Sequence, residues 1–328
     1  MKILILNHSE VERLLPVREC IPVMSDALMS LARNEVYQPL RMVVRPPDAN
    51  GAMGLMPSHR AGNQPAYGVK VVCIFPENPK KGLDAHQGSV MLLSGETGEL
   101  LALMNASAIT AIRTAAVSAV ATQVLARADA SELAIIGSGV QARTHIEAMA
   151  CARQIKRARV ASRDFENAKR FAEEMRPRYS FPIEPVETVE QAVSRADLIA
   201  LTTTANEPIV KREWIASGAH LNAVGSSIPT TREVDSALMS ASSLFVDRRE
   251  STINESGDYL LALNEGAIKP DHIRAEIGEL LIGTAQGRTS ADEITLFKSL
   301  GLAVEDLASA EYLYRKAEQM QAGHWVEY

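Results

Sequence analysis

Three small residues stand at fixed spacing directly after an apolar run: Gly137, Gly139 and Ala142, in the order Gly-x-Gly-x-x-Ala. Residues 132–136 predict a buried strand, and residues 140–151 have the periodicity of a helix. In such a unit the first glycine allows a tight turn, the second lets a pyrophosphate approach the backbone, and the small third residue lets helix pack on strand. Free N–H groups of the first helical turn would face the phosphates. The predicted dinucleotide-binding loop comprises Gly137, Ser138, Gly139, Val140, Gln141 and Ala142.

The residues after the next strand indicate which dinucleotide fits. Sites for NAD(H) usually place an acidic residue there for the ribose hydroxyls, whereas NADP(H) sites avoid that charge and often supply an arginine. Here the predicted strand 159–161 is followed by Ser162 and Arg163, so the sequence favours NADP(H), with NAD(H) as the alternative. In the other interpretation Arg163 is a solvated surface residue. Asp164 suits the N-cap of the following helix in either case.

Three basic residues stand among apolar neighbours. Arg41 and Lys70 lie in strand-like runs, and Arg113 interrupts an alanine-rich helical pattern. A single cation on a half-buried strand usually points to solvent, so spacing alone leaves a structural role open for each. Together they also match a pocket for a carboxylate, because ammonium and guanidinium groups bind carboxylates through charge-assisted hydrogen bonds. Arg41, Lys70 and Arg113 are therefore the candidate catalytic residues.

Other reactive residues give weaker signals. No metal-ligand spacing and no Ser/His/Asp arrangement appears in the sequence, so we predict no metal site. His86 is the other candidate acid or base, although a structural role is more common for any one histidine. Cys20, Cys73 and Cys151 lie far apart and are expected to be reduced.

Composition excludes several classes of protein. The net charge of −6 argues against a nucleic-acid partner. The first residues carry one positive charge and a short apolar run without a small-residue cleavage site, which predicts a strand and not a signal peptide. The apolar region 100–126 is interrupted by Asn105, Arg113 and Gln123, so we expect no membrane span. We therefore expect a cytoplasmic protein with a small-molecule substrate.

The pattern of apolar residues, prolines and glycines changes along the chain. Residues 36–103 hold short β-rich runs between Pro and Gly clusters, which predicts antiparallel strands in an α+β domain. Residues 109–127 predict a long helix linking two domains. From residue 132 strands and helices alternate, which predicts parallel βαβ units with helices on both faces of a sheet. Residues 294–320 are again interpreted as helical and long enough to return to the first domain.

These patterns define the predicted fold. At 328 residues the chain is long for one core. We expect an α/β protein with a Rossmann doubly wound parallel sheet at residues 119–305. Residues 1–118 and 306–328, from both chain ends, would form an α+β domain for dimerisation and substrate binding.

Several motifs together form a more specific signature. Besides the glycine loop they are Gln38-Pro39-Leu40-Arg41, Leu55-Met56-Pro57-Ser58, Tyr67-Gly68-Val69-Lys70, Ile109-Thr110-Ala111-Ile112-Arg113-Thr114-Ala115-Ala116, Gly278-Glu279-Leu280-Leu281 and Ile294-Thr295-Leu296-Phe297-Lys298-Ser299-Leu300-Gly301. In this combination, over nearly the whole chain, the sequence resembles the ornithine cyclodeaminase/mu-crystallin family.

The resemblance implies a homodimer in which the first domain supplies the dimer contact and faces a Rossmann domain across a cleft. It implies that Arg41, Lys70 and Arg113 line the substrate site, with the arginines on an amino-acid carboxylate and Lys70 beside the reacting carbon and nitrogen. We add Met56 and Ser227 to this site. Further cofactor contacts are assigned to Thr114, Thr203, Val224, Ser226, Lys298 and Gly301.

Two departures from the cyclodeaminase pattern narrow the reaction. Cyclodeaminases of this family carry a glutamate where this chain has Gly54, and an aspartate where it has Ser227. A serine hydroxyl is a poor base without a partner, whereas ketimine reductases of the mu-crystallin type tolerate a serine there. We therefore predict NAD(P)H-dependent reduction of cyclic or open ketimines, such as Δ1-piperideine-2-carboxylate or Δ1-pyrroline-2-carboxylate, to an L-amino acid.

Three rival functions remain open. An alanine-type amino-acid dehydrogenase would need ammonia, and an ornithine cyclodeaminase would release ammonia from ornithine with no net change in nicotinamide. A non-enzymatic, NADP-dependent protein that binds a small ligand is the alternative from another class. Retention of Lys70 with both arginines counts against that alternative.

Overall fold

The computed structural model describes residues 2–328 and divides into two compact units. The first unit combines the chain up to Thr114 with Gly301–Tyr328, and the second comprises Ala115–Leu300. The expected divisions were after residues 118 and 305. Both divisions of the contact-based units lie a few residues earlier. At the second, helix α11 (Ala303–Met320) begins before residue 306, and its first turn pairs with Arg113 in the first unit.

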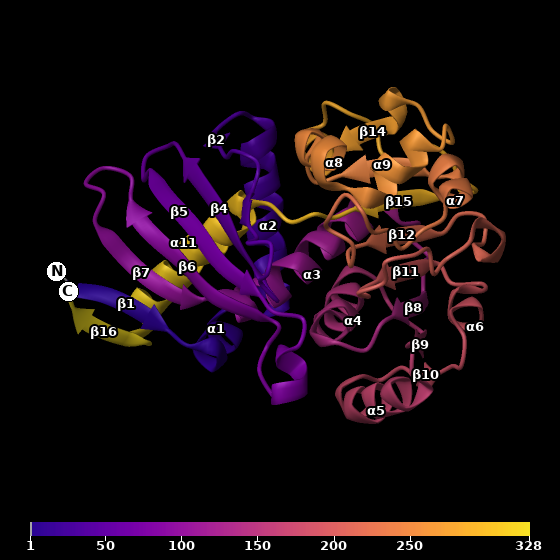
Figure 1. The fold of residues 1–328 in the computed structure, drawn as a ribbon, viewed down its shortest axis with the longest axis horizontal. Coiled ribbons are helices and arrows are strands. Elements are labelled where there is room, and N and C mark those ends of the chain that lie inside the picture. The colour runs from indigo at the N-terminus through magenta and orange to yellow at the C-terminus, as the bar shows by residue number, and fades with distance from the viewer. Residues whose placement is uncertain (1) are drawn as a thin grey trace. The chain divides into compact units, whose positions relative to one another are not determined.

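A mixed sheet forms the first unit, with the strand order β16-β1-β7-β6-β5-β4-β2 and with β3 paired to β4. Neighbouring strands are antiparallel, except that β1 and β7 are parallel. Helix α11 packs along one face of this sheet (Figure 1). The other elements are β1 (Lys2–Leu6), α1 (His8–Leu14), α2 (Val17–Ala32), β2 (Val36–Tyr37), β3 (Met42–Val44), β4 (Ala52–Arg60), β5 (Ala66–Ile74), β6 (His86–Ser94), β7 (Leu100–Asn105) and β16 (His324–Glu327).

Alternation along β5 decides which of its side chains lie under α11. A Cβ atom on Gly68 would lie 3.0 Å from the side chain of Leu307 in α11, so this face of the strand carries the helix. Because side chains alternate along a strand, Lys70 points to the same face as Gly68. Met56 of β4 lies opposite Lys70 in the strand register. The strand thus places a cation beneath the first turns of α11.

The second unit is built on an eight-stranded parallel sheet in the order β10-β9-β8-β11-β12-β15-β13-β14. Chain order reverses between β8 and β11, and such a switch point is where α/β sheets bind ligands at the carboxyl ends of their strands. The predicted Rossmann sheet with a separate α+β unit is confirmed. The strands are β8 (Glu132–Ile136), β9 (Arg157–Ala161), β10 (Ile183–Pro185), β11 (Leu198–Leu201), β12 (His220–Ala223), β13 (Ser243–Val246), β14 (Ile273–Glu276) and β15 (Thr295–Lys298).

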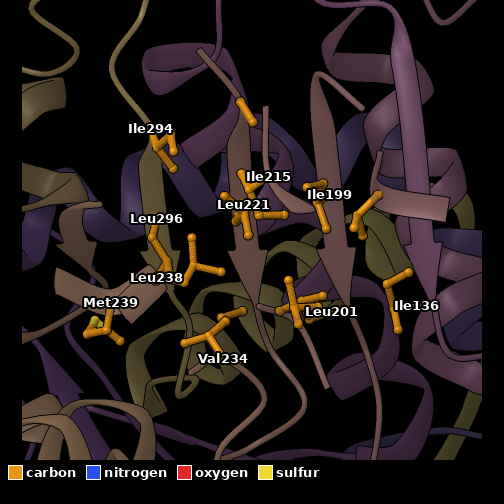
Figure 2. Packing of buried hydrophobic residues seen from close by; sticks show 14 of the residues in the cluster. Ile136, Ile199, Leu201, Ile215, Leu221, Val234, Leu238, Met239, Ile294 and Leu296 are labelled. Carbon is orange, nitrogen blue, oxygen red and sulfur yellow. The ribbon is translucent and has the colours of Figure 1, made fainter. Parts of the chain in front are cut away.

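The central strands of this unit, β11, β12 and β15, are completely buried. Figure 2 shows Ile199 and Leu201 of β11, Leu221 of β12 and Leu296 of β15 within one apolar cluster. All four side chains are fully buried, as expected for central strands of a parallel sheet. The helices are α3 (Ala106–Leu125), which runs on from the first unit, α4 (Val140–Ala152), α5 (Phe165–Met175), α6 (Val189–Val193), α7 (Ser236–Ala241), α8 (Arg249–Glu255), α9 (Gly257–Asn264) and α10 (Ile277–Leu281).

One predicted helix is partly wrong. Residues 294–320 were interpreted as continuously helical, but Thr295–Lys298 form strand β15, and the helix begins only at Ala303. The run pairs with β12 on one side and with β13 on the other. A run this short cannot be assigned to helix or strand from periodicity alone, and here tertiary pairing selects the strand.

Helix α3 is apolar on all sides. By length and composition it could cross a membrane, yet 83% of its most apolar window is buried inside the protein. A helix that is hydrophobic all round fits the core of a large protein equally well, and this burial identifies α3 as a core helix.

Candidate cofactor and substrate sites

The glycine loop has the geometry that its sequence predicts. Gly137 has φ +110°, and a Cβ atom there would lie 2.7 Å from the carbonyl oxygen of Thr202. Only glycine is comfortable in that conformation and in that space. Ala142 is fully buried, so the small third residue does allow close packing of α4. The loop therefore leaves β8 in a tight turn beside the end of β11.

The second glycine leaves room for a ligand. Gly139 is the N-cap of α4, and a Cβ atom built on it would have no atom within 4 Å. Within the described residues, no side chain caps this end of the helix. Open space beside uncapped N–H groups and the positive end of the helix dipole fits a pyrophosphate. These residues thus fit the dinucleotide that the motif predicts.

The tip of β9 is joined to the glycine loop. The hydroxyl oxygens of Ser138 and Ser162 lie 3.0 Å apart in a hydrogen bond. Arg163 is exposed, and Asp164 caps α5 by accepting a hydrogen bond from the backbone N–H of Glu166 at 3.0 Å. The acidic side chain nearest this tip is therefore engaged at a helix N-terminus.

A buried carboxylate organises the loops after β11 and β12. Glu233 accepts hydrogen bonds from the Thr203 backbone N–H (3.0 Å), the Thr203 hydroxyl (2.8 Å) and the Gly225 N–H (2.7 Å). Burial raises the pKa of Glu233, and the positive charge of Lys298 opposes that rise. The Lys298 ammonium donates to the Ser226 carbonyl at 2.6 Å. Thr203, Ser226 and Lys298 are thus brought together, with Lys298 fully buried behind the loop.

The three predicted cations come together with two carboxylates of the first unit. Lys70 Nζ lies 2.8 Å from Asp306 Oδ2 and 3.3 Å from Thr110 Oγ1. Arg113 donates to Glu305 Oε2 at 2.8 Å and to Asp306 Oδ1 at 3.1 Å. Asp306 therefore bridges Lys70 and Arg113, both of which are buried.

Arg41 joins this cluster through the chain segment that precedes α11. It donates to the carbonyl oxygen of Gly301 at 3.1 Å. A Cβ atom on Gly301 would lie 2.4 Å from the guanidinium of Arg113, and the φ of this glycine is +77°. Gly301, predicted to contact the cofactor, thus lies between two arginines of the predicted substrate site.

The environment changes the acidity of two groups in the cluster. Burial lowers the pKa of Lys70 to about 8; the carboxylate of Asp306 opposes the change and the charge of Arg113 adds to it. Desolvation, followed by the positive charges of Lys70 and Arg113, lowers the pKa of His86. An ammonium group with a pKa near neutrality can give up a proton readily.

The start of α11 is fixed from both sides. The Gln38 side chain accepts a hydrogen bond from the Val304 N–H at 2.9 Å and so caps the helix. The Ser58 hydroxyl donates to the Ala303 carbonyl at 3.2 Å. The motifs at residues 38–41 and 55–58 therefore place α11 against the sheet.

Four predicted site residues keep roles that their positions alone do not define, and other site residues were missed. Thr114 is buried in α3, Val224 and Ser227 are partly exposed after β12, and Met56 lies opposite Lys70. Their roles stay predictions. Sequence reasoning missed Glu233, Asp258, Glu305 and Asp306. The signal available for the last two was a pair of acids in the apolar run 302–310.

The fold and both sites define a dinucleotide-binding α/β protein with a buried cationic cluster in a second, α+β unit. The chain belongs to the ornithine cyclodeaminase/mu-crystallin family, whose family model matches residues 1–321.

Relatives with curated names are similar over most of their length. A Δ1-pyrroline-2-carboxylate reductase from Bacillus cereus is 37% identical over 326 residues, covering 99% of this chain and 100% of that protein. The ketimine reductase mu-crystallin of Mus musculus is 39% identical over 297 residues, or 90% of each chain.

Two solved structures share the fold. The Δ1-pyrroline-2-carboxylate reductase of Thermococcus litoralis, in complex with NADH and L-proline, has a TM-score of 0.96 and 42% identity, covering 99% of this chain and 100% of that one. An archaeal alanine dehydrogenase dimer with bound NAD has a TM-score of 0.93 and 32% identity, and coverage is 100% of both chains.

Proposed function

We propose that this chain is an NAD(P)H-dependent oxidoreductase that reduces a C=N bond next to a carboxylate. Its substrates would be cyclic or open ketimines of the Δ1-pyrroline-2-carboxylate or Δ1-piperideine-2-carboxylate type, and its products L-amino acids. The observation that carries the proposal is the buried cluster of Lys70, Arg41 and Arg113. Relatives named for this reaction, and one bound to NADH and L-proline, support it.

The residues of the first unit have separate tasks in this mechanism. Arg41 and Arg113 bind the carboxylate, since guanidinium groups form short paired hydrogen bonds with it. Lys70, as an ammonium group, donates a hydrogen bond and then a proton to the imine nitrogen, which keeps that nitrogen cationic and the carbon electrophilic. The dihydronicotinamide, when bound, supplies the hydride that the imine carbon accepts. Holding the reactants at attack distance contributes much of the rate.

The second unit would hold the dinucleotide. The pyrophosphate would contact the loop 137–142, and Thr203, Val224 and Ser226 would surround the nicotinamide end. Thr114 is a further predicted contact of the cofactor, and Met56 and Ser227 are predicted contacts of the substrate. Lys298 and Glu233 would support this end from behind, because both are fully buried.

We further propose a preference for NADP(H) over NAD(H). Ser162 and Arg163 present a hydroxyl and a cation at the tip of β9, which suits a 2′-phosphate. The relative from Thermococcus litoralis was solved with NADH, so NADH is the natural competitor in the assay.

A direct assay tests the proposal. The purified protein is mixed with NADPH or NADH and either cyclic ketimine, and nicotinamide absorbance is followed without added ammonia. Oxidation that is lost in Lys70→Met supports ketimine reduction, with Lys156→Met, a variant in the second unit, as the control. Oxidation only with an oxo acid plus ammonia would instead identify an amino-acid dehydrogenase. Ammonia release from ornithine would identify a cyclodeaminase and overturn the interpretation of Gly54 and Ser227.

The non-enzymatic alternative makes a different prediction for the same variant. If the pocket only bound a small ligand, the wild type would turn over no substrate. Lys70→Met could then leave ligand binding intact. Isothermal titration with L-proline, in the presence of NADP+, separates these outcomes.

We also propose a homodimer, formed through the face of the first sheet opposite α11. On β5 this face carries Tyr67, Val69 and Val71, and Tyr67 is 50% exposed. Apolar side chains on an uncovered sheet face favour burial against a partner. An archaeal alanine dehydrogenase of the same fold is a dimer, which supports a second copy as that partner.

Light scattering during gel filtration tests the dimer. The wild type should elute at about twice 35.6 kDa, and Val71→Glu should elute as a monomer, because an unpaired charge cannot be buried at the interface. Ile253→Glu in the second unit is the control. A Val71→Glu dimer would refute this face as the interface.

We also propose a cytoplasmic location. Cys20, Cys73 and Cys151 are free thiols, which suits a reducing compartment. Fractionation of the source cells tests this.

A further inference from the structure

Asp306 contacts both kinds of cation that the proposed reaction uses. Its Oδ2 lies 2.8 Å from Lys70 Nζ, and its Oδ1 lies 3.1 Å from Arg113 Nε. The side chains of Lys70, Asp306 and Arg113 are 3%, 1% and 5% exposed. A carboxylate so deeply buried must be paired, and these two cations pair it.

The hydrogen bonds of Lys70 leave room for a substrate. An ammonium group has three N–H donors. Within the part of the chain that the structure describes, one of them is donated to Thr110 Oγ1, and Asp306 Oδ2 lies 2.8 Å from Nζ in an ion pair. These two contacts restrict the position of the ammonium group and leave donor capacity for a ligand.

Asp306 is itself held in place. It lies in the first turn of α11, whose start is capped by Gln38 and bound by Ser58. Early positions of a helix also favour negative charge, because the helix dipole is positive there. The carboxylate is thus a fixed point between β5 and α3.

We propose that Asp306 is a positioning residue, which keeps Lys70 in its ammonium form and ties it to the arginine that binds the substrate carboxylate. The inference rests on the proposed ketimine reduction. In this role Asp306 aligns the proton donor, Lys70, with Arg113, which binds the carboxylate of the substrate. The alternative is that Asp306 only neutralises charge to stabilise the fold.

The charges around Lys70 give the proposal a measurable consequence. The groups that face it are Asp306 on α11, Arg113 and Thr110 on α3, Arg41 before β3 and His86 on β6. Asp306 is the acidic member, while Glu305 pairs with Arg113. Without Asp306, burial and the neighbouring cations would all favour the neutral amine. Lys70 should then lose its proton at a lower pH.

The pH dependence of kcat/KM for the ketimine tests this. In the wild type the alkaline limb, where Lys70 loses its proton, should lie near pH 8. In Asp306→Asn it should move down by about one to three pH units, the usual effect of an opposite charge at this distance. The substrate's own ionisation is the same in both proteins and cancels. Asp306→Ser is a second neutral variant, in case the amide is not accommodated.

The adjacent acid provides the matched control. Glu305→Gln removes a carboxylate that pairs with Arg113 but leaves the Lys70–Asp306 pair, so its alkaline limb should stay with the wild type. Asp306→Glu, which keeps the charge, should restore the limb while kcat stays reduced. A folded neutral Asp306 variant with an unshifted limb, or an equal shift in Glu305→Gln, would overturn the proposal.

A second readout does not need turnover. Calorimetry can follow the binding of pyrrole-2-carboxylate, a planar carboxylate of similar size. As the pH rises and Lys70 loses its proton, this binding should weaken, and the weakening should begin at a lower pH in Asp306→Asn than in the wild type. If this difference appears while the wild type reduces no ketimine, the positioning role stands and the proposed function fails. If the wild type reduces the ketimine but the alkaline limbs of the wild type and Asp306→Asn coincide, the proposed function stands and the positioning role fails.

Discussion

Lys298 Nζ lies 2.9 Å from Asp258 Oδ2, and both side chains are completely buried. Asp258 Oδ1 also accepts the backbone N–H of Glu233 at 2.8 Å, and the Lys298 ammonium donates to the Ser226 carbonyl. One ion pair thus joins β15, the start of α9 and the loop after β12. Because the pair is completely buried, we expect it to support the loop after β12, while the predicted cofactor contact of Lys298 stays a prediction.

Lys298→Met should therefore destabilise the second unit. It would leave Asp258 buried without its cation, a loss of about 3–5 kcal/mol for a buried pair. Urea unfolding followed by circular dichroism measures the change, and Lys269→Met, outside this pair, should have little effect. Unchanged stability with a much weaker affinity for NADPH would instead support direct cofactor contact.

Alanine substitutions at the two glycines of the dinucleotide loop should have different effects on stability and on cofactor affinity. Gly137→Ala places a Cβ atom 2.7 Å from the Thr202 carbonyl oxygen at φ +110°, so it should lower the unfolding midpoint. Gly139→Ala meets no protein atom within 4 Å and should leave stability nearly unchanged. Its methyl group would occupy the expected pyrophosphate space and raise the KM for NADPH at least tenfold, a loss of about 1.4 kcal/mol. Equal effects on cofactor affinity and stability in both variants would contradict this division.

The local signals in the sequence were informative because neighbouring residues produce them. The strand–glycine loop–helix unit at 132–152 depends on turn geometry and packing within one segment, so spacing alone predicts it. The cations Arg41, Lys70 and Arg113 could be identified because charge is unusual in apolar runs. The sequence did not show which carboxylates they meet.

Long-range pairing explains what the sequence could not predict. Asp306 and Glu305 lie early in a helical pattern, where acids are normally solvated caps, and their partners come from the other end of the chain. Glu233 is similar, since its hydrogen-bond donors belong to loops that only the folded sheet brings together. The strand Thr295–Lys298 was missed because four residues are too few to show a period, and its pairing with two neighbouring strands is visible only in the fold.

Arg163 should carry much of the preference for NADPH. Arg163→Ala should raise the KM for NADPH by about tenfold, the equivalent of one charge-assisted hydrogen bond, while leaving the KM for NADH nearly unchanged. Ser162→Asp should favour NADH further, by repelling a 2′-phosphate. Steady-state kinetics with both cofactors measure this. Arg170→Ala, an exposed arginine on the next helix, is the control, and an unchanged ratio of the two KM values in Arg163→Ala would assign that residue to the surface.

A substitution at Gly301 tests how Arg113 is positioned to bind the substrate carboxylate. Gly301→Ala would bring a methyl carbon within 2.4 Å of the Arg113 guanidinium, so Arg113 must move and the KM for the ketimine should rise. Gly283→Ala is the matched control, because its φ of +76° is nearly the same as the +77° of Gly301 but its Cβ would meet nothing. Both variants should lose about 1 kcal/mol of stability from the backbone alone. A rise confined to the KM for NADPH in Gly301→Ala would favour the original assignment to the cofactor.

Two buried histidines predict how stability depends on pH. Burial lowers the pKa of His145 to about 4 and that of His220 to about 3, from 6.5. Well above pH 6.5 neither histidine is charged in the folded or the unfolded chain, so neither affects stability there. Below pH 6.5 the unfolded chain binds protons that the folded chain cannot, so the free energy of unfolding should fall by up to about 1.4 kcal/mol per pH unit for each histidine.

Replacing one of them should flatten that decline. His145 is hydrogen-bonded to Ser118 and to the carbonyl of Gln141, so His145→Gln keeps a polar side chain but cannot bind the proton. Unfolding by urea at a series of pH values should show a smaller slope between pH 6.5 and about pH 4 than in the wild type, even if the variant is less stable at neutral pH. His8→Gln on the surface should retain the wild-type slope. A His145→Gln slope equal to the wild type would mean that His145 takes up its proton in the folded state, which its full burial beside a single carbonyl acceptor argues against.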